Sequence, residues 1–158
     1  MQSDLYHFLL QVHNFLRWIV LLVLLMGIFQ SLTARNRPFN SGDRSTGTLI
    51  VIFADIMLLI GIYQWVTGPW GLKLIQSMGM SGVMKDSAAR FFAIEHTAGM
   101  LIAIILIHIG KSYARKTLPD KIKHRRTVLF YILALLIILI SIPWPFRDLV
   151  GRPWLRIH

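Results

Sequence analysis

Residues 18–29 read Trp-Ile-Val-Leu-Leu-Val-Leu-Leu-Met-Gly-Ile-Phe and contain no charged side chain. They form the densest part of a longer, mostly apolar stretch, residues 5–32. A helix needs about 20 mostly apolar residues to cross the hydrocarbon core of a bilayer, so this stretch is long enough. It differs from a secretory signal peptide, because no cationic side chain precedes Arg17 and no small-x-small cleavage pattern follows. The sequence therefore predicts a retained transmembrane helix over residues 5–32.

Three further stretches have the same apolar character, and turn-forming or charged segments separate them. The corresponding helices are predicted over residues 48–67, 90–111 and 127–143. The composition agrees, since 55% of the 158 residues are hydrophobic and only 15% are charged. A soluble domain carries about 25% charged residues. We therefore predict an all-α fold in which residues 1–158 form a single membrane domain, a four-helix transmembrane bundle.

The distribution of positive charge predicts how the bundle sits in its membrane. The chain has 17 Lys and Arg against 7 Asp and Glu, a net charge of +10. Ten of these cations lie in the first and third loops and six in the second loop and the C-terminal tail. Because short loops rich in Lys and Arg stay in the cytoplasm, we predict an N-out/C-out, multi-pass protein of the bacterial inner membrane. No nucleic-acid partner is expected, because the basic run has little aromatic interleaving.

Several kinds of chemistry are excluded by residues that the chain lacks. It has no cysteine, which rules out disulfides, thiolate metal sites, Cys-ligated iron–sulfur clusters and covalently attached c-type haem. It also contains no G-x-S-x-G motif, no P-loop and no dinucleotide fingerprint. Candidate functional residues must therefore be sought among the polar side chains of the predicted spans.

Ionisable side chains inside a membrane span are costly, so each one is a candidate for function. The first span carries His13 and Arg17, and the second carries Asp55. The third span carries the remaining candidates, Glu95, His96 and His108, and the fourth carries none. We expect Asp55, Glu95 and His108 to take part in a polar network.

His13 and His96 form the most informative pair. With a rise of 1.5 Å per residue, His13 lies about 12 Å from the outer end of its helix and His96 about 9 Å from the same side. Two histidines at one depth on different helices are what a b-type haem needs for its two axial positions. Gly99, on the His96 face, leaves room for a macrocycle, and Arg17, one turn from His13, matches a haem propionate. The predicted cofactor site is therefore His13, His96, Arg17 and Gly99, with both histidines on the haem iron.

Other readings of these residues stay open at this point. Gly99 also has the small side chain that lets two helices approach closely. Arg17 has Asp55 and Glu95 as alternative partners. The set His13, Asp55, Glu95 and His96 offers mixed nitrogen and oxygen ligands for a metal ion, or groups for proton relay. The other three histidines are assigned no role, because they lie near a terminus or in a loop: His7, His124 and His158.

Four motifs resemble a known group of short bacterial four-helix integral membrane proteins that are labelled cytochrome b or cytochrome b-like, and the resemblance covers nearly the whole chain. The motifs are His13-Asn-Phe-Leu-Arg17-Trp, Arg90-Phe-Phe-Ala-Ile-Glu95-His96, His108-Ile-Gly110-Lys, and Ile142-Pro-Trp-Pro-Phe-Arg147 with Gly151-Arg-Pro-Trp154. The resemblance implies a haem b within the bundle, with His13 and His96 as candidate axial ligands, and a link to membrane electron transfer. Larger two-haem relatives space two histidines on one helix by about four turns, or roughly 14 residues. Because His96 and His108 are 12 apart, one haem is expected.

The expected function is a b-type haem-binding electron-transfer subunit of a membrane, with the haem in the outer half of the bundle. Its expected partners are the lipid bilayer, a quinol or a periplasmic electron carrier, and a larger membrane complex or a homo-oligomer. The chain has no room for a separate catalytic domain, so a subunit is favoured over a self-contained enzyme. The alternative is a haem-free membrane subunit of a larger complex, in which the His, Arg, Asp and Glu residues form a structural or proton-linked network.

Overall fold

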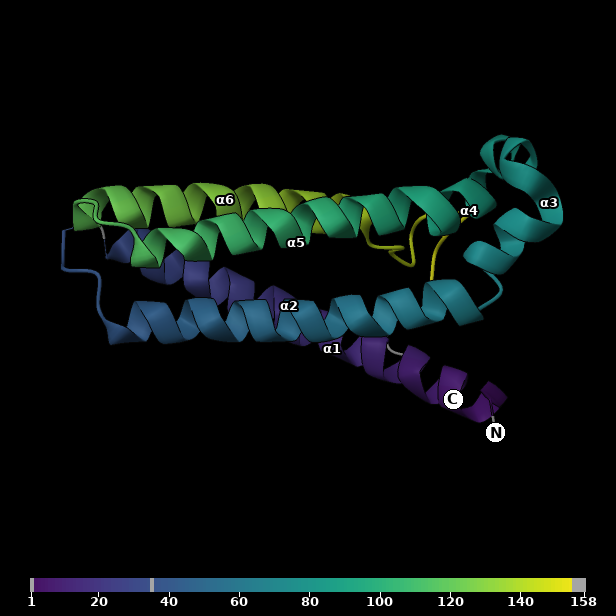
Figure 1. Ribbon diagram of the computed structural model, residues 1–158, viewed down its shortest axis with the longest axis horizontal. Coiled ribbons are helices and arrows are strands. Elements are labelled where there is room, and N and C mark those ends of the chain that lie inside the picture. Colours follow the sequence, from purple (N-terminus) through teal and green to yellow (C-terminus); the bar gives the residue numbers. More distant parts are fainter. Residues whose placement is uncertain (1, 35, 155–158) are drawn as a thin grey trace.

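The computed structural model describes residues 2–34 and 36–154, and within these ranges the chain is helical or irregular, without strands (Figure 1). Four segments are long and apolar enough to cross a membrane, which confirms the predicted all-α, multi-pass architecture. These four are α1 (Gln2–Thr33), α2 (Ser41–Thr67), a rod over residues 87–115, and α6 (Asp120–Ser141). The rod consists of α4 (Ser87–Arg90), the π-helical segment η1 (Phe91–Glu95), α5 (His96–Ser112) and the 3₁₀ turn η2 (Tyr113–Arg115). A further helix, α3 (Leu72–Lys85), joins α2 to this rod.

The long helices form a ring of neighbours. α1 packs against α2, α2 against α5, α5 against α6, and α6 against α1, so that α1 lies diagonally opposite α5. Residues 36–40 and 113–119 connect the helices at one end of the bundle, here named the loop end (Figure 1). The opposite end, here named the α3 end, holds the start of α1, helices α3 and α4, and residues 142–154 (Figure 1).

Two helices begin seven residues before their predicted starts. α2 begins at Ser41 rather than at residue 48, because Asn40 and Asp43 form a capping box. The Asp43 backbone N–H donates to the Asn40 side chain at 3.2 Å, and the Asn40 N–H donates to the Asp43 carboxylate at 2.9 Å. α6 begins at Asp120, directly after Pro119, rather than at residue 127. In both cases the first turns are polar, so a hydropathy pattern excludes residues that the helix includes.

The bundle core is organised around Tyr131 of α6. Its ring lies where the three other long helices each contribute a glycine, Gly27 of α1, Gly47 of α2 and Gly110 of α5. A Cβ atom on Gly110 would lie only 2.7 Å from Tyr131 Cε1, and one on Gly27 would lie 3.2 Å from Cε2. Real Cβ atoms essentially never approach to 2.7 Å, and 3.2 Å is tighter than most real Cβ contacts, so the glycines allow the helices to close around the ring.

The α3 end has a second, smaller core. Val83 of α3 packs with Ala89 and Ala93 of the rod. α3 is broken at Gly79, whose φ of 69° is in the left-handed region that favours glycine. The break lets both halves of α3 lie across this end of the bundle, as Figure 1 shows.

Candidate functional site

His96 is the first residue of α5 and directly follows the π-helical segment. The His96 backbone N–H donates to the Phe91 carbonyl, five residues back, and the Trp65 indole N–H of α2 donates to the Ala93 carbonyl at 2.8 Å. The His96 ring itself contacts the end of α6: its Nδ1 lies 2.7 Å from the carbonyl oxygen of Ser141, the last residue of that helix. A π-helical turn of this kind inside a helix frequently marks a functional position.

The contact with Ser141 fixes the tautomer of His96. A carbonyl oxygen can only accept a hydrogen bond, so Nδ1 must carry the proton. In the neutral imidazole, Nε2 then has a free lone pair, which is the state of a histidine that binds a metal. The contact with the Ser141 carbonyl therefore leaves the lone pair of the neutral His96 ring on Nε2.

His13 reaches the same region from the diagonally opposite helix. Its ring lies against Gly61 of α2, where a Cβ atom would be 3.5 Å from His13 Cε1. His13, His96 and Arg17 are close enough for their charges to interact. The structure therefore brings together three of the four residues that the sequence assigned to a cofactor site.

Several buried polar atoms of this region have no hydrogen-bond partner. Within the described residues they include His13 Nδ1, Asn14 Oδ1, Arg17 Nε and Gln64 Nε2. Asn14 follows His13 on α1, and Gln64 is one turn from the glycine that His13 touches. Leaving a buried polar group unpaired costs free energy, so these four groups around His13 are candidates for contacts with a ligand or water.

Arg17 is tied to the C-terminal segment. Its Nη2 donates to the Trp154 carbonyl oxygen at 2.7 Å, and the Trp18 indole N–H donates to the same oxygen at 3.2 Å. The guanidinium carbon lies 5.1 Å from the centroid of the Trp18 ring and 5.9 Å from that of Trp144. The alternative partners that the sequence offered for Arg17, two carboxylates of other helices, are wrong, because both are engaged elsewhere.

Those two carboxylates and His108 do not form one network. Asp55 Oδ1 lies 2.8 Å from His108 Nε2, and Glu95 Oε1 lies 2.7 Å from Arg90 Nε. The expected network of Asp55, Glu95 and His108 is thus two separate pairs, because Asp55 and His108 meet between α2 and α5 while Glu95 contacts its own rod. Among the described residues no three His, Asp or Glu side chains are grouped to hold a metal ion. This finding contradicts the mixed-ligand metal site.

Gly99 allows close helix packing, the alternative to the predicted role of leaving room for a macrocycle. A Cβ atom at this position would overlap Ser141 Oγ and lie 3.1 Å from Ser141 Cβ. The glycine therefore lets α5 and α6 approach closely, and this approach is also what brings the Ser141 carbonyl within reach of His96. The room at Gly99 is filled by the neighbouring helix.

The chain matches no protein-family model, no curated protein and no solved structure. The likeness to cytochrome b-like proteins consequently stays a prediction that rests on the quoted motifs.

One histidine that the sequence set aside has an unexpected position. His124 was assigned to a loop, but it lies inside α6 and is fully buried, and within the described part of the chain neither ring nitrogen has a hydrogen-bond partner. Its ring packs against Phe39, with 4.9 Å between centroids. The cationic neighbours of His124 in the sequence predicted an exposed position, and no pattern in the sequence predicted its contact with Phe39. His7 is exposed as expected, and His158 lies outside the described residues.

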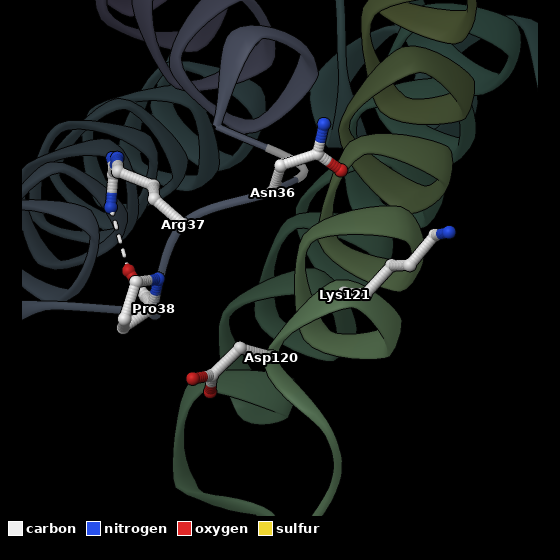
Figure 2. Close-up of a pocket in the computed structure, with 5 residues that line it drawn as sticks. All are labelled: Asn36, Arg37, Pro38, Asp120 and Lys121. Atoms are coloured by element: carbon white, nitrogen blue, oxygen red, sulfur yellow. Dashed lines mark hydrogen bonds between the residues drawn. The ribbon is translucent and has the colours of Figure 1, made fainter.

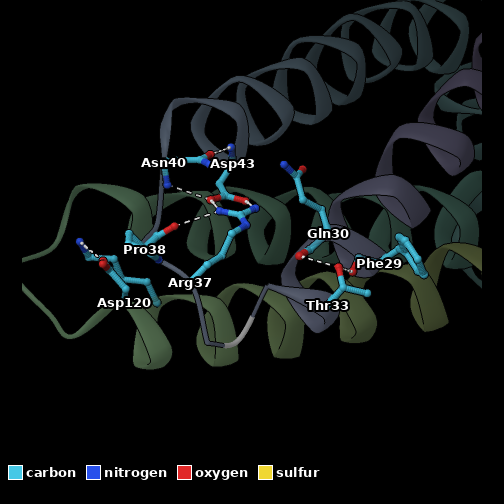
Figure 3. Close-up of polar contacts among 9 residues, drawn as sticks. Phe29, Gln30, Thr33, Arg37, Pro38, Asn40, Asp43 and Asp120 are labelled. Atoms are coloured by element: carbon cyan, nitrogen blue, oxygen red, sulfur yellow. Dashed lines mark hydrogen bonds and ion pairs between the residues drawn. The ribbon is translucent and has the colours of Figure 1, made fainter.

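The loop end holds an open hollow of about 400 Å³ between residues 36–38 and the start of α6 (Figure 2). Two of the charged residues that line it, Arg37 and Asp120, form ion pairs with neighbouring side chains. Arg37 makes two bonds to the Asp43 carboxylate, at 2.7 and 2.8 Å, and Asp120 pairs with Lys123 at 3.3 Å (Figure 3). The hydrogen bond to Asp43 raises the pKa of Arg37 above its ordinary value. These contacts secure the connection between α1 and α2, and we assign no ligand to the hollow.

Proposed function

We propose that this protein is a b-type haem-binding electron-transfer subunit of a membrane, with one haem at the α3 end and with His13 and His96 as axial ligands. The observation that carries the proposal is the hydrogen bond from His96 Nδ1 to the Ser141 carbonyl. It orients the imidazole and leaves Nε2 as the ligating nitrogen, as in other metal-bound histidines.

The arrangement of the helices supports this proposal. α1 and α5 are diagonal in the bundle, so two imidazoles approaching from opposite sides suit the two axial positions of one haem. A haem takes only two ligands from the chain, which agrees with a site where two histidines meet and no third ligand joins them. Arg17 Nε has no partner and is available as a donor to a propionate. Gly99 is left out of the proposed site, because Ser141 occupies the space beside it.

Bound haem supplies one-electron redox chemistry, and the chain supplies its position. The two basic loops share the loop end of the bundle, opposite the histidines (Figure 1). If those loops lie in the cytoplasm of a bacterium, the haem lies near the outer face of the inner membrane. The electron donor is then a quinol or a periplasmic carrier, and the acceptor is a larger membrane complex.

A second candidate function keeps the same site without haem. Water molecules that bridge His13 Nδ1, Asn14 Oδ1 and Gln64 Nε2 would satisfy the buried polar atoms and form a path for protons. In that case the protein is a haem-free membrane subunit of a larger complex.

An absorption spectrum of the purified protein from haem-replete cells distinguishes the two candidates. We expect the reduced bands of a low-spin b-type haem, at about one haem per chain, since two axial imidazoles give this state. His13→Ala and His96→Ala should each abolish these bands, whereas His7→Ala, at an exposed position of the same helix as His13, should retain them. Added imidazole should restore a low-spin spectrum to each alanine variant if the fold persists.

A colourless wild-type protein, or an unchanged spectrum in both alanine variants, would overturn the haem proposal. The colourless result would favour the water-filled alternative, and partners that co-purify with the protein would then be the next observation.

A further inference from the structure

The pair formed by Asp55 and His108 faces out of the bundle. Its two side chains keep 43% and 49% of their surface exposed while their mutual contact is 2.8 Å. Asp55 is 14 residues from Ser41 and 12 from Thr67, the two ends of α2. The first turns of α2 are polar, so its apolar stretch begins near Thr48, seven residues or about 10 Å from Asp55, and Lys111 follows His108 by three residues. The pair therefore lies in the apolar part of α2, toward the loop end.

The surface around this pair is apolar. Ile52 and Leu59 lie one turn to either side of Asp55 on α2, and both are exposed. Ile105 lies one turn from His108 on α5 and is also exposed. The pair is therefore a polar spot on a face that otherwise suits lipid, where ionisable side chains are rare because they are costly.

This face is also the part of the bundle that the chain itself covers least. In the apolar windows of α1 and α6, 39% of residues are buried inside the molecule, against 17% for α2 and for the rod that contains α5. α2 and α5 are neighbours, so their uncovered sides form one continuous face. We name it the α2/α5 face, and its polar centre is Asp55 with His108.

Each residue of the pair keeps one polar atom that can still form a hydrogen bond, which indicates what kind of partner packs on the α2/α5 face. Their contact uses Asp55 Oδ1 and His108 Nε2, which leaves Oδ2 on one residue and Nδ1 on the other. Lipid chains offer no donor or acceptor to either atom. A ring of hydrogen bonds between two such pairs uses both N–H groups of a doubly protonated imidazole and both oxygens of an ionised carboxylate.

We propose that a second copy of this chain packs on the α2/α5 face, through a two-fold axis parallel to the membrane normal. Such an axis keeps each residue at its own depth and places the partner's His108 opposite Asp55, and the reverse. Each free N–H then meets a free carboxylate oxygen, which closes a ring of two histidines and two aspartates with no net charge. A two-fold interface is self-complementary in this way, and hydrogen bonds between helices drive association in membranes.

The chain lacks cysteine, so single spin labels can be placed at will. The test uses Ile105→Cys, on the α2/α5 face, and Leu136→Cys, which is exposed on α6. Each labelled variant is reconstituted in lipid nanodiscs, and distances between copies are measured by double electron–electron resonance. We expect one defined interchain distance for each label, with the distance at position 105 the shorter. Absence of an interchain distance, or a shorter distance at position 136, would overturn the proposal.

Two double variants test the role of the polar pair. Asp55→Leu with His108→Leu should abolish the interchain distance at position 105 and halve the protein mass per particle. Arg90→Leu with Glu95→Leu removes another exposed pair, at the α3 end, and should leave the distance unchanged. A wild-type distance in the first double variant would show that other contacts join the copies and would overturn the proposal. If that variant does not fold, the comparison of positions 105 and 136 decides alone.

Discussion

At the scale of single residues, the end of α6 explains how the orientation and tautomer of His96 are set. The last carbonyl groups of a helix have no partner within it and must be satisfied by other groups. Trp144 donates to the Leu139 carbonyl at 2.8 Å and Arg147 to the Ile140 carbonyl at 2.9 Å. His96 satisfies the next one, that of Ser141. One hydrogen bond thus serves the stability of α6 and the tautomer of the imidazole.

The glycines around Tyr131 provide a stability prediction. Gly110→Ala should lower the free energy of unfolding by about 1–3 kcal/mol, because the new methyl group would overlap the Tyr131 ring and overpack the core. Gly61→Ala is the matched control in another long helix, since its Cβ would lie 3.5 Å from His13 Cε1, an ordinary contact. Unfolding in detergent micelles, followed by circular dichroism, measures both. Equal stability of the two variants would contradict the proposed closeness of packing at Tyr131.

The fixed helical rise predicted a similar depth for His13 and His96, and the structure brings the two close enough for their charges to interact. Depth was not sufficient to find their partners. The acceptor for His96 is a backbone carbonyl, which has no sequence signature, and Arg17 is bound by the carbonyl of Trp154 for the same reason. Asp55 was expected in a network with both His108 and Glu95 and was also offered as a partner for Arg17, but among the residues that the structure describes it pairs with His108 alone. Depth says nothing about which side of a helix a residue occupies.

At the scale of elements, the π-helical segment η1 links α2 to the proposed site. Its wider turn changes the direction of the residues that follow, and the Trp65 indole bond to the Ala93 carbonyl ties this turn to α2. The π turn has no sequence signature, since its five residues, Phe91–Glu95, also suit an α-helix. The orientation of His96 therefore depends on a contact with another helix.

Replacing this indole tests that dependence. Trp65→Phe keeps an aromatic ring but removes the donor, and the unpaired carbonyl should cost about 1–3 kcal/mol. We expect faster amide hydrogen exchange over residues 91–96 and weaker retention of haem by the loaded protein. Trp70→Phe is the control, because a phenyl ring preserves the contact of Trp70 with Phe92. Unchanged exchange over residues 91–96 in Trp65→Phe would show that the π turn does not need this bond.

Hydropathy predicted the four spans but not their starts, and the reason differs between helices. For α2 the signal was present as Asn40 followed three residues later by Asp43, a capping-box pattern that the search for apolar residues passed over. For α6 the basic residues 121–126 resembled a loop by composition, although Lys and Arg are good helix formers. The order of helices around the bundle had no sequence signal, since four antiparallel spans allow more than one arrangement.

At the scale of the whole molecule, the two ends of the bundle differ in charge. Near the loop end Asp43 and Asp120 are paired with Arg37 and Lys123, and further cations lie there among the described residues. These include Lys116, which lies 4.1 Å from the centroid of the Tyr113 ring. A cationic end of this kind favours the cytoplasmic side, where anionic lipids and the positive-inside bias act together.

Single cysteines test this orientation, because the natural chain has none. Lys116→Cys lies at the loop end and Ser77→Cys lies in α3, and both positions are exposed. In intact bacterial spheroplasts a membrane-impermeant maleimide should label position 77 at once and position 116 only after permeabilisation. The opposite pattern would place His13 and His96 near the cytoplasm. A periplasmic carrier would then have no access to a haem at these histidines, and the electron donor would have to be cytoplasmic or a quinol on the inner leaflet, even if the spectrum confirmed the haem itself.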